Sequence, residues 1–301
     1  MVQVNFTCMK LVVGVLLFLV CLTSCEKVLD VQPATDLGTL VVDGTIESGQ
    51  PPIIVLSTSL NYFSKVSPEI LSGSQVHNAR VIVSDGLRTH QLKEYKRDLG
   101  NGYNLSYYSS DTASPSTVII GEPGKTYMLT IETGGKQYQA STKIPLLQKQ
   151  VDSIWWKKAP GEADSLKAVV VARVTDPAGY GNYIRYYTRV NSGNFLPGAN
   201  SVFDDQIVDG TTYDIQVDQG IDRNDPPDFE NYGFFKKGDT ATIKFANIDK
   251  ATYDFWRTIE YSYQSIGNPF STPTTIINNV SGALGAFCGY SIQFKTLIIP
   301  K

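Results

Sequence analysis

The chain has 301 residues with 26 basic and 29 acidic side chains, so its formal net charge is −3. This mild acidity argues against nucleic-acid binding, because a protein that contacts the phosphate backbone needs a basic face. The 17 tyrosines, 13 phenylalanines, 25 glycines and 15 prolines indicate many short strands joined by turns. We therefore expect an all-β protein.

Residues 1–24 are predicted to be a secretory signal peptide. Lys10 is the only charged residue before Glu26, and an apolar run follows it from Leu11 to Leu22. A basic residue, an apolar run and then small residues make such a signal. The run is shorter than the roughly 18 residues that a membrane-spanning helix needs. Its removal takes away one positive charge, so the mature chain would carry a net charge of −4.

The end of this segment, Leu22-Thr23-Ser24-Cys25, resembles the lipobox of bacterial lipoproteins. In that family the cysteine thiol receives a diacylglyceryl group and a peptidase cuts before it, which implies lipidation, with palmitate-like chains, at Cys25. Two or three acyl chains anchor a protein stably, whereas one binds only marginally. An ordinary signal peptide with a stray cysteine is the alternative. Residues 25–38 show no period and contain a proline, so we expect a flexible lipidated tether.

The cysteines exclude a disulfide in the mature chain. Cys8 and Cys21 would leave with the signal peptide, and Cys25 would carry lipid. Cys288 then has no partner, so the fold must rest on its core despite an oxidising compartment. Its neighbours from Ala286 to Tyr290 are mostly apolar, which favours a buried, inert thiol.

The first predicted domain covers residues 39–145. Its clearest element is a hairpin in which strands 126–132 and 136–144 turn at Gly134-Gly135, because a glycine pair supplies the positive φ of a tight turn. Further strands are expected at 39–46, 53–57, 79–84 and 89–95. About seven strands in this length match an immunoglobulin-like sandwich, with Tyr103 or Tyr127 as its corner tyrosine.

The second predicted domain covers residues 151–301 and follows a junction at 145–150. We expect a second β-sandwich-like fold, with strands at 151–156, 166–175, 182–190, 201–208, 211–217, 240–246 and 285–299, the last broken near Gly289.

One α-helix, residues 249–266, is predicted within this domain. Asp249 is a good N-cap, and Gly267 follows the helix. Tyr253, Trp256, Glu260 and Tyr263 recur at helical spacing and form a mainly aromatic stripe. Such a stripe usually packs against a sheet.

Dispersed motifs carry a resemblance to a known family. In chain order they are Leu40-Val41-Val42-Asp43-Gly44, Gly121-Glu122-Pro123-Gly124-Lys125-Thr126-Tyr127, Phe203-Asp204-Asp205, Tyr253-Asp254-Phe255-Trp256, Asn268-Pro269-Phe270 and Asn278-Asn279-Val280-Ser281-Gly282-Ala283-Leu284-Gly285. Together they resemble the Bacteroidota lipoproteins called domain of unknown function four-two-four-nine, over nearly the whole mature chain. The resemblance implies an outer-membrane lipoprotein, often encoded beside a TonB-dependent receptor, and no known activity. Cys288 departs from it, since a glycine is expected there.

Carboxylates offer the first candidate chemistry. Asp204, Asp205 and Asp209 could form the acid pair of a glycoside hydrolase, which needs two carboxyl groups facing one site. However, neighbouring residues on a strand point to opposite faces, so Asp204 and Asp205 cannot share a site. A non-enzymatic protein is therefore favoured.

A metal or cofactor is not expected. The polar stretch with Asp222, Asn224, Asp225 and Asp228 is a weak calcium candidate, since its oxygen ligands suit Ca²⁺ but the EF-hand spacing is missing. A solvated acidic loop is the simpler interpretation. The two histidines, His77 and His90, lack partners for zinc binding or for a catalytic triad.

Three functional hypotheses remain. The first is a binding or accessory lipoprotein of the outer membrane, anchored through Cys25 and associated with a TonB-dependent receptor. The second is a glycan-binding surface lipoprotein, with Trp155 and Trp156 as candidate stacking rings, of which one must point away from the core in a regular strand. The third is a carboxylate-dependent hydrolase. Both the periplasmic and the outer face of the membrane stay open.

Overall fold

The computed structural model describes residues 38–60, 67–100, 102–161, 166–225, 230–265, 271–272 and 274–301. The predicted signal peptide, Cys25 and almost all of the tether lie outside these residues. The described chain is all-β, as the sequence predicts, with two helices, α2 (Pro68–Gly73) and α3 (Lys250–Ser265). No helix in it combines the length and the apolar character that crossing a bilayer requires.

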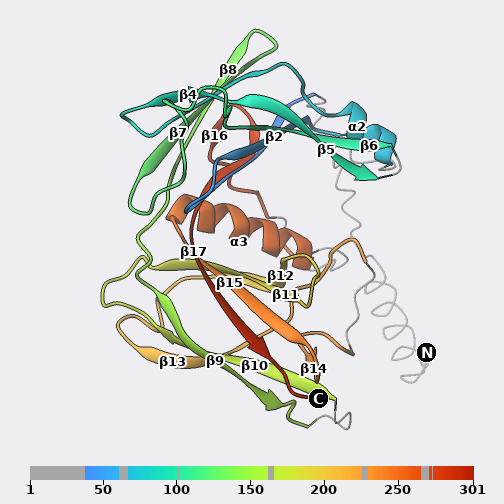
Figure 1. The fold of residues 1–301 in the computed structure, drawn as a ribbon, viewed down its shortest axis with the longest axis vertical. Helices are drawn as coiled ribbons and strands as arrows, with labels where there is room; N and C mark the ends of the chain where they lie inside the picture. The colour runs from blue at the N-terminus through green and yellow to red at the C-terminus, as the bar shows by residue number, and fades with distance from the viewer. Residues whose placement is uncertain are drawn as a thin grey trace, which may run out of the picture. The chain divides into compact units, whose positions relative to one another are not determined.

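The strands form three sheets (Figure 1). The first segment contributes β1 (Leu40–Glu47), β2 (Ile53–Thr58), β3 (Arg80–Ser84), β4 (Thr89–Gln91), β5 (Lys93–Gly100), β6 (Tyr103–Ser109), β7 (Thr126–Thr133) and β8 (Lys136–Lys143). The second contributes β9 (Gln150–Lys158), β10 (Lys167–Thr175), β11 (Tyr183–Val190), β12 (Leu196–Phe203), β13 (Thr212–Val217), β14 (Phe235–Lys236), β15 (Thr240–Ile248), β16 (Val280–Ser281) and β17 (Leu284–Ile298).

The largest sheet crosses the predicted boundary between the two segments. Its eight strands run in the order β12-β11-β15-β17-β1-β2-β6-β5. β1 pairs in parallel with β17, from Val41 opposite Leu284 to Glu47 opposite Tyr290. The other sheets are β16-β8-β7-β3-β4 and β13-β10-β14, with β9 also paired to β10. Residues Leu37–Lys301 form one compact unit. The division into two domains, residues 39–145 and 151–301, stays a prediction.

β17 contributes side chains to three hydrophobic cores, because successive side chains of a strand point to opposite faces. Phe287 lies in the core that the large sheet shares with the β7–β8 sheet, and Leu297 packs against the core shared with the β9–β10 sheet. Cys288 and Tyr290 point the opposite way, into a third core beneath α3. Because odd and even residues of a strand face opposite sides, one strand can supply all three cores.

Two strand predictions are wrong in detail. β17 continues through Gly289 without the predicted break. A Cβ at this position would lie 2.8 Å from the carbonyl oxygen of Lys143, so the glycine allows β8 to approach closely. The strand predicted at 201–208 is β12, which begins at Leu196 and ends at Phe203. The helix α2 was not predicted.

The predicted hairpin of the first segment is confirmed. β7 and β8 pair from Thr126 opposite Lys143 to Thr133 opposite Lys136, and Gly134 and Gly135 both have positive φ. Tyr127, rather than Tyr103, is the corner tyrosine. Its buried hydroxyl accepts a hydrogen bond from the amide of Glu122 and donates one to Ile120 O.

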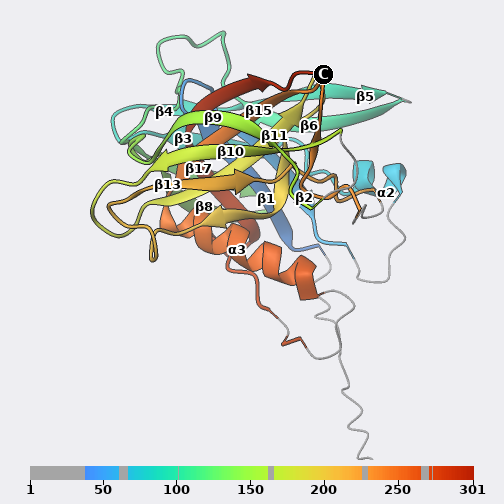
Figure 2. The ribbon, with the colours of Figure 1, turned by 90° about the horizontal axis from the view of Figure 1, so that it is seen from below.

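The edge strand β5 ends the large sheet on the side of the first segment. With β6 it forms a hairpin that extends beyond the neighbouring strands (Figure 2). Most of its residues are exposed, and they include Lys93, Lys96 and Arg97. Charged side chains on an exposed edge discourage pairing with another chain.

α3 is held on the large sheet by buried polar contacts. The Arg185 guanidinium lies 3.4 Å from the Trp256 ring centroid, and Trp256 Nε1 donates to Tyr290 Oη at 2.8 Å. Glu260, which is 1% exposed, accepts a hydrogen bond from the amide of Ser201. The stripe predicted on this helix therefore packs inward as far as Glu260, whereas Tyr263 is 51% exposed.

Asp249 joins the two segments at the start of α3. Its Oδ1 accepts the amide of Thr252, which confirms the predicted N-cap. Its Oδ2 accepts both the hydroxyl of Thr142 and the amide of Lys143 at the end of β8. One carboxylate therefore caps the helix and attaches it to the first segment.

Replacing Asp249 by Ala should lower the free energy of unfolding by about 2–3 kcal/mol, because a cap and two charge-assisted hydrogen bonds are lost together. Urea unfolding would measure this. Asp254→Ala is the matched control, since Asp254 pairs only with the exposed Lys250 four residues earlier and should cost less than about 0.5 kcal/mol. Equal destabilisation by both changes would contradict the role given to Asp249.

Candidate functional site

A cavity of about 560 Å³ lies between the large sheet and the β9–β10 sheet. Its walls come from β11, β12 and β15 on one side and from β9, β10 and β13 on the other, and they are mostly aliphatic or aromatic. Representative wall residues are Val151, Ala172, Ile184, Val202, Ile243 and Phe245. Ile207 and Ile215, which are 95% and 39% exposed, also line it. The cavity therefore reaches solvent beside the edge strands β12 and β13.

A few polar side chains stand among these apolar walls, at Asn200, Asp204, Gln216, Asp218 and Arg257. Asp204 Oδ2 accepts a hydrogen bond from the hydroxyl of Tyr253. Burial and the nearby Asp204 carboxylate raise the pKa of Tyr253 to about 12, so this phenol stays protonated. Within the described part of the chain, Arg257 makes no ion pair, and its guanidinium lies over the ring of Tyr261.

At one end of the cavity, Tyr213 separates it from a buried cluster of charged groups. Carboxylate oxygens of Asp176, Asp205 and Asp209 lie within 4.8 Å of one another. Lys149 Nζ lies 2.9 Å from Asp176 Oδ1, and both side chains are fully buried. The ammonium also lies 5.7 Å from the centroid of the Tyr213 ring. Lys149 thus supplies a positive charge to this cluster.

Of the three carboxylates considered for hydrolysis, Asp204 lies apart from Asp205 and Asp209. Asp204 faces the cavity, whereas Asp205 lies in the buried cluster, where its Oδ2 accepts the amides of Gly181 and Asn182. Asp209 Oδ1 accepts the amide of Gly179. Asp205 and Asp209 therefore both bind backbone amides of the 179–182 turn.

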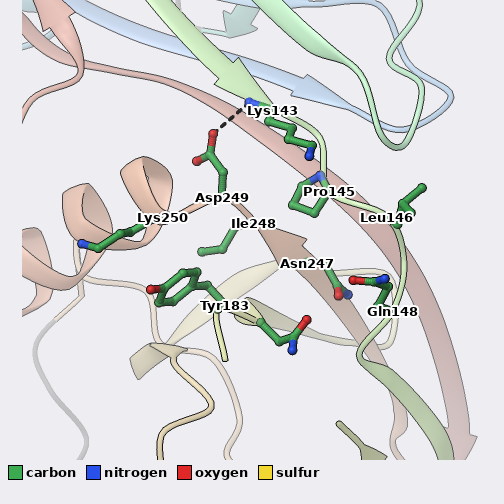
Figure 3. Close-up of a pocket in the computed structure, with 11 residues that line it drawn as sticks. Lys143, Pro145, Leu146, Gln148, Tyr183, Asn247, Ile248, Asp249 and Lys250 are labelled. Atoms are coloured by element: carbon green, nitrogen blue, oxygen red, sulfur yellow. Dashed lines mark hydrogen bonds between the residues drawn. The ribbon is translucent and has the colours of Figure 1, made fainter. Parts of the chain in front are cut away.

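A second hollow, of about 430 Å³, lies where the linker between β8 and β9 crosses the start of α3 (Figure 3). Pro145, Leu146 and Gln148 line one side, and Tyr183 and Lys250 line the other. Figure 3 shows the Asp249 carboxylate directed at the Lys143 amide. The hollow therefore follows from the attachment of the linker to α3.

The two tryptophans considered for glycan stacking do not share a face. Trp156 packs against the core of the second segment, whereas Trp155, opposite Val171, faces outward from the sheet and is half-buried. Lys157 Nζ and Arg173 Cζ each lie 5.8 Å from the Trp155 ring centroid. Only Trp155 can therefore offer a ring to a ligand.

The remaining residues considered for metal binding or catalysis make local contacts or are buried. Asp222 Oδ1 accepts the amides of Asn224, which makes a local turn, and Asp228 lies outside the described residues. His77 binds Glu94, and His90 contacts the hydroxyl of Thr117. Burial raises the pKa of the Cys288 thiol to about 12, in keeping with an inert cysteine.

Sequence reasoning missed Lys149 and Asp176. The sequence places Lys149 in the predicted junction at 145–150 and Asp176 directly after the predicted strand 166–175. The antiparallel pairing of β9 with β10 could have predicted this contact. It places Gln150 opposite Thr175, and so brings Lys149, before β9, beside Asp176, after β10. Asp205 and Asp209 join them only through the fold of the 204–210 turn.

The described chain is an all-β protein with a cavity of ligand size between two sheets, and Asp204 and Asp218 are acidic residues of its lining. The chain belongs to the family described as Domain of unknown function (DUF4249), whose model matches residues 26–296. No curated protein matches the chain in sequence. Membership therefore confirms the domain of unknown function named from the sequence motifs, whereas its description as a Bacteroidota lipoprotein stays a prediction.

Proposed function

We propose that the protein is a lipid-anchored protein of the outer membrane that acts by binding a small apolar ligand and not by catalysis. The observation that carries this proposal is the cavity of about 560 Å³ between the sheets. Ligand sites commonly measure roughly 300–1,000 Å³ and have apolar walls with a few fixed polar groups. The Val, Ile and Phe walls and the few polar side chains, Arg257 among them, fit that description.

The use of the carboxylates supports the non-catalytic part of the proposal. A hydrolase of the glycosidase type needs two carboxyl groups on either side of one bond. Asp204 is the acid beside Tyr253 at the cavity, while Asp205 is turned away into the Lys149 cluster. Asp218, the other acid of the cavity, accepts a hydrogen bond from Gln216 Nε2.

The lipobox and the signal peptide support the anchoring part of the proposal, and the family resemblance supports an accessory role beside a TonB-dependent receptor.

We expect the wild-type protein to partition into detergent and to co-purify with an outer-membrane receptor. Cys25→Ala should move it to the aqueous phase without lowering its melting temperature, because Cys25 precedes β1 by a tether. Detergent partitioning of the alanine variant at the wild-type level would refute lipid attachment at this cysteine.

Filling the cavity should abolish ligand binding. Ile215→Trp places a large ring at the partly exposed wall of β13, where no buried side chain is removed. The fluorescent probe 1-anilinonaphthalene-8-sulfonate should bind the wild-type protein, and the Kd should rise at least about tenfold in the variant, which corresponds to about 1.4 kcal/mol.

Ile298→Trp is the matched control for this change, because Ile298 is 71% exposed and is not part of the cavity wall. Its Kd for the probe should equal that of the wild type. A wild-type protein that leaves the probe unbound, or binding that both variants retain, would count against a ligand site between the sheets.

Glycan binding is the second candidate function, and the outward ring of Trp155 favours it. Arg173 beside this ring pairs with Asp214 through two hydrogen bonds, so polar groups flank an aromatic platform. Sugars stack on aromatic faces while their hydroxyl groups bond such neighbours. If glycans bind here, Trp155→Ala should remove the signal on a glycan array, whereas Tyr180→Ala, which removes an exposed aromatic ring, should leave it intact.

A further inference from the structure

The strongest unexplained feature of the molecule is the contact between Lys149 and Asp176. Lys149 directly precedes β9, and Asp176 directly follows β10, so the antiparallel pairing of these strands sets the two residues opposite each other. Their side chains are 0% exposed, and Nζ lies 2.9 Å from Oδ1. Among the described residues, neither of these two atoms makes an aligned hydrogen bond, and the Tyr213 side chain is the other group close to the ammonium.

Such a contact is costly if it remains an ion pair. Removing an ammonium and a carboxylate from water costs several kcal/mol for each ion, and aligned hydrogen bonds are what normally offset this. Here Lys149 Nζ and Asp176 Oδ1 lack such bonds, and two further carboxylates, of Asp205 and Asp209, add negative charge at the same place.

Both partners are also held in place. The Lys149 backbone makes two hydrogen bonds with the Asn247 side chain, at 3.0 and 2.8 Å. The amide of Asp176 donates to Thr211 O, and its Oδ2 accepts the amide of Gly210. Reacting groups that a rigid frame keeps in contact behave as if at very high effective concentration.

We propose that Lys149 and Asp176 condense to an intramolecular isopeptide bond. A proton passes from the ammonium to the Asp176 carboxylate, which leaves a neutral amine and a neutral acid. The Nζ lone pair then forms a bond to Cγ. Asp205 accepts a proton from the nitrogen and returns one to the departing oxygen. The Cγ–O bond breaks and water leaves, so an amine and an acid become an amide plus water without oxidant or reductant.

Asp205 suits the role of proton carrier. It is 2% exposed, and the amides of Gly181 and Asn182 hold its Oδ2, so Oδ1 is left for the transfer. The product would replace two buried charges by one neutral amide. It would also fasten the start of β9 to the end of β10, beside the linker that joins the two segments.

Peptide mapping of the full-length mature protein, purified from membranes and denatured, tests the proposal directly. Trypsin cuts after lysine and arginine, but not after a lysine whose amine is in an amide. We expect the peptide Ile144–Lys157, uncut at Lys149, joined to Val174–Arg185, with a mass one water below their sum. Unlinked Ile144–Lys149, Gln150–Lys157 and Val174–Arg185 at unmodified masses would overturn the proposal.

Two variants test the chemistry. Lys149→Arg keeps a cation beside Asp176 but has no lysine amine, so the linked peptide should disappear. Asp205→Asn should reduce the linked fraction strongly, whereas Asp214→Asn, which changes an exposed acid bound to Arg173, should leave it unchanged. Full linkage in Asp205→Asn would remove the role given to Asp205, and a linked peptide in Lys149→Arg would show that another residue reacts.

Discussion

The parallel pairing of β1 with β17 is the constraint on which the rest of the described chain depends. These strands stand near the two ends of the sequence, yet seven successive residue pairs join them. The pairing places β2, β6 and β5 on one side of β17 and β15, β11 and β12 on the other. Without it the large sheet would divide into two parts. Burial of apolar side chains along both faces of β17 then stabilises all three cores.

The position of the candidate site follows from this arrangement. The large sheet presents β11 and β12 to the β9–β10 sheet, and the space between their walls is the cavity. α3 lies on the opposite face of the large sheet, where Arg185 and Glu260 fix it, and its residues Tyr253 and Arg257 reach the cavity. Asp249 at its start is bound to β8. The cavity is therefore built from parts that the long-range pairing brings together.

Local signals in the sequence predicted local structure well. The glycine pair predicted the β7–β8 turn, Asp249 predicted the start of α3, and alternation predicted that Trp155 and Trp156 face opposite sides. These features depend on residues close in sequence, so turn, capping and strand geometry suffice to infer them.

The remaining features depend on contacts between distant residues, which one sequence does not display. Gly289 looks like a strand break, but it is a point of close approach to Lys143. The cavity requires β11, β12 and β13 to lie on facing sheets, and the cluster of Lys149, Asp176 and Asp205 requires three separate turns to meet. A periodic pattern within one segment does not predict these contacts, because they form only when the sheets have assembled.

Native-state hydrogen exchange tests most directly whether the two segments form one cooperative structure through β1 and β17. Amides of β7 in the first segment and of β10 in the second should exchange through openings of equal free energy, within about 1 kcal/mol, and so should those of β1 and β17. If β7 exchanged through an opening that left β10 protected, or the reverse, the segments would unfold separately, which would contradict a sheet that depends on the pairing of its first and last strands.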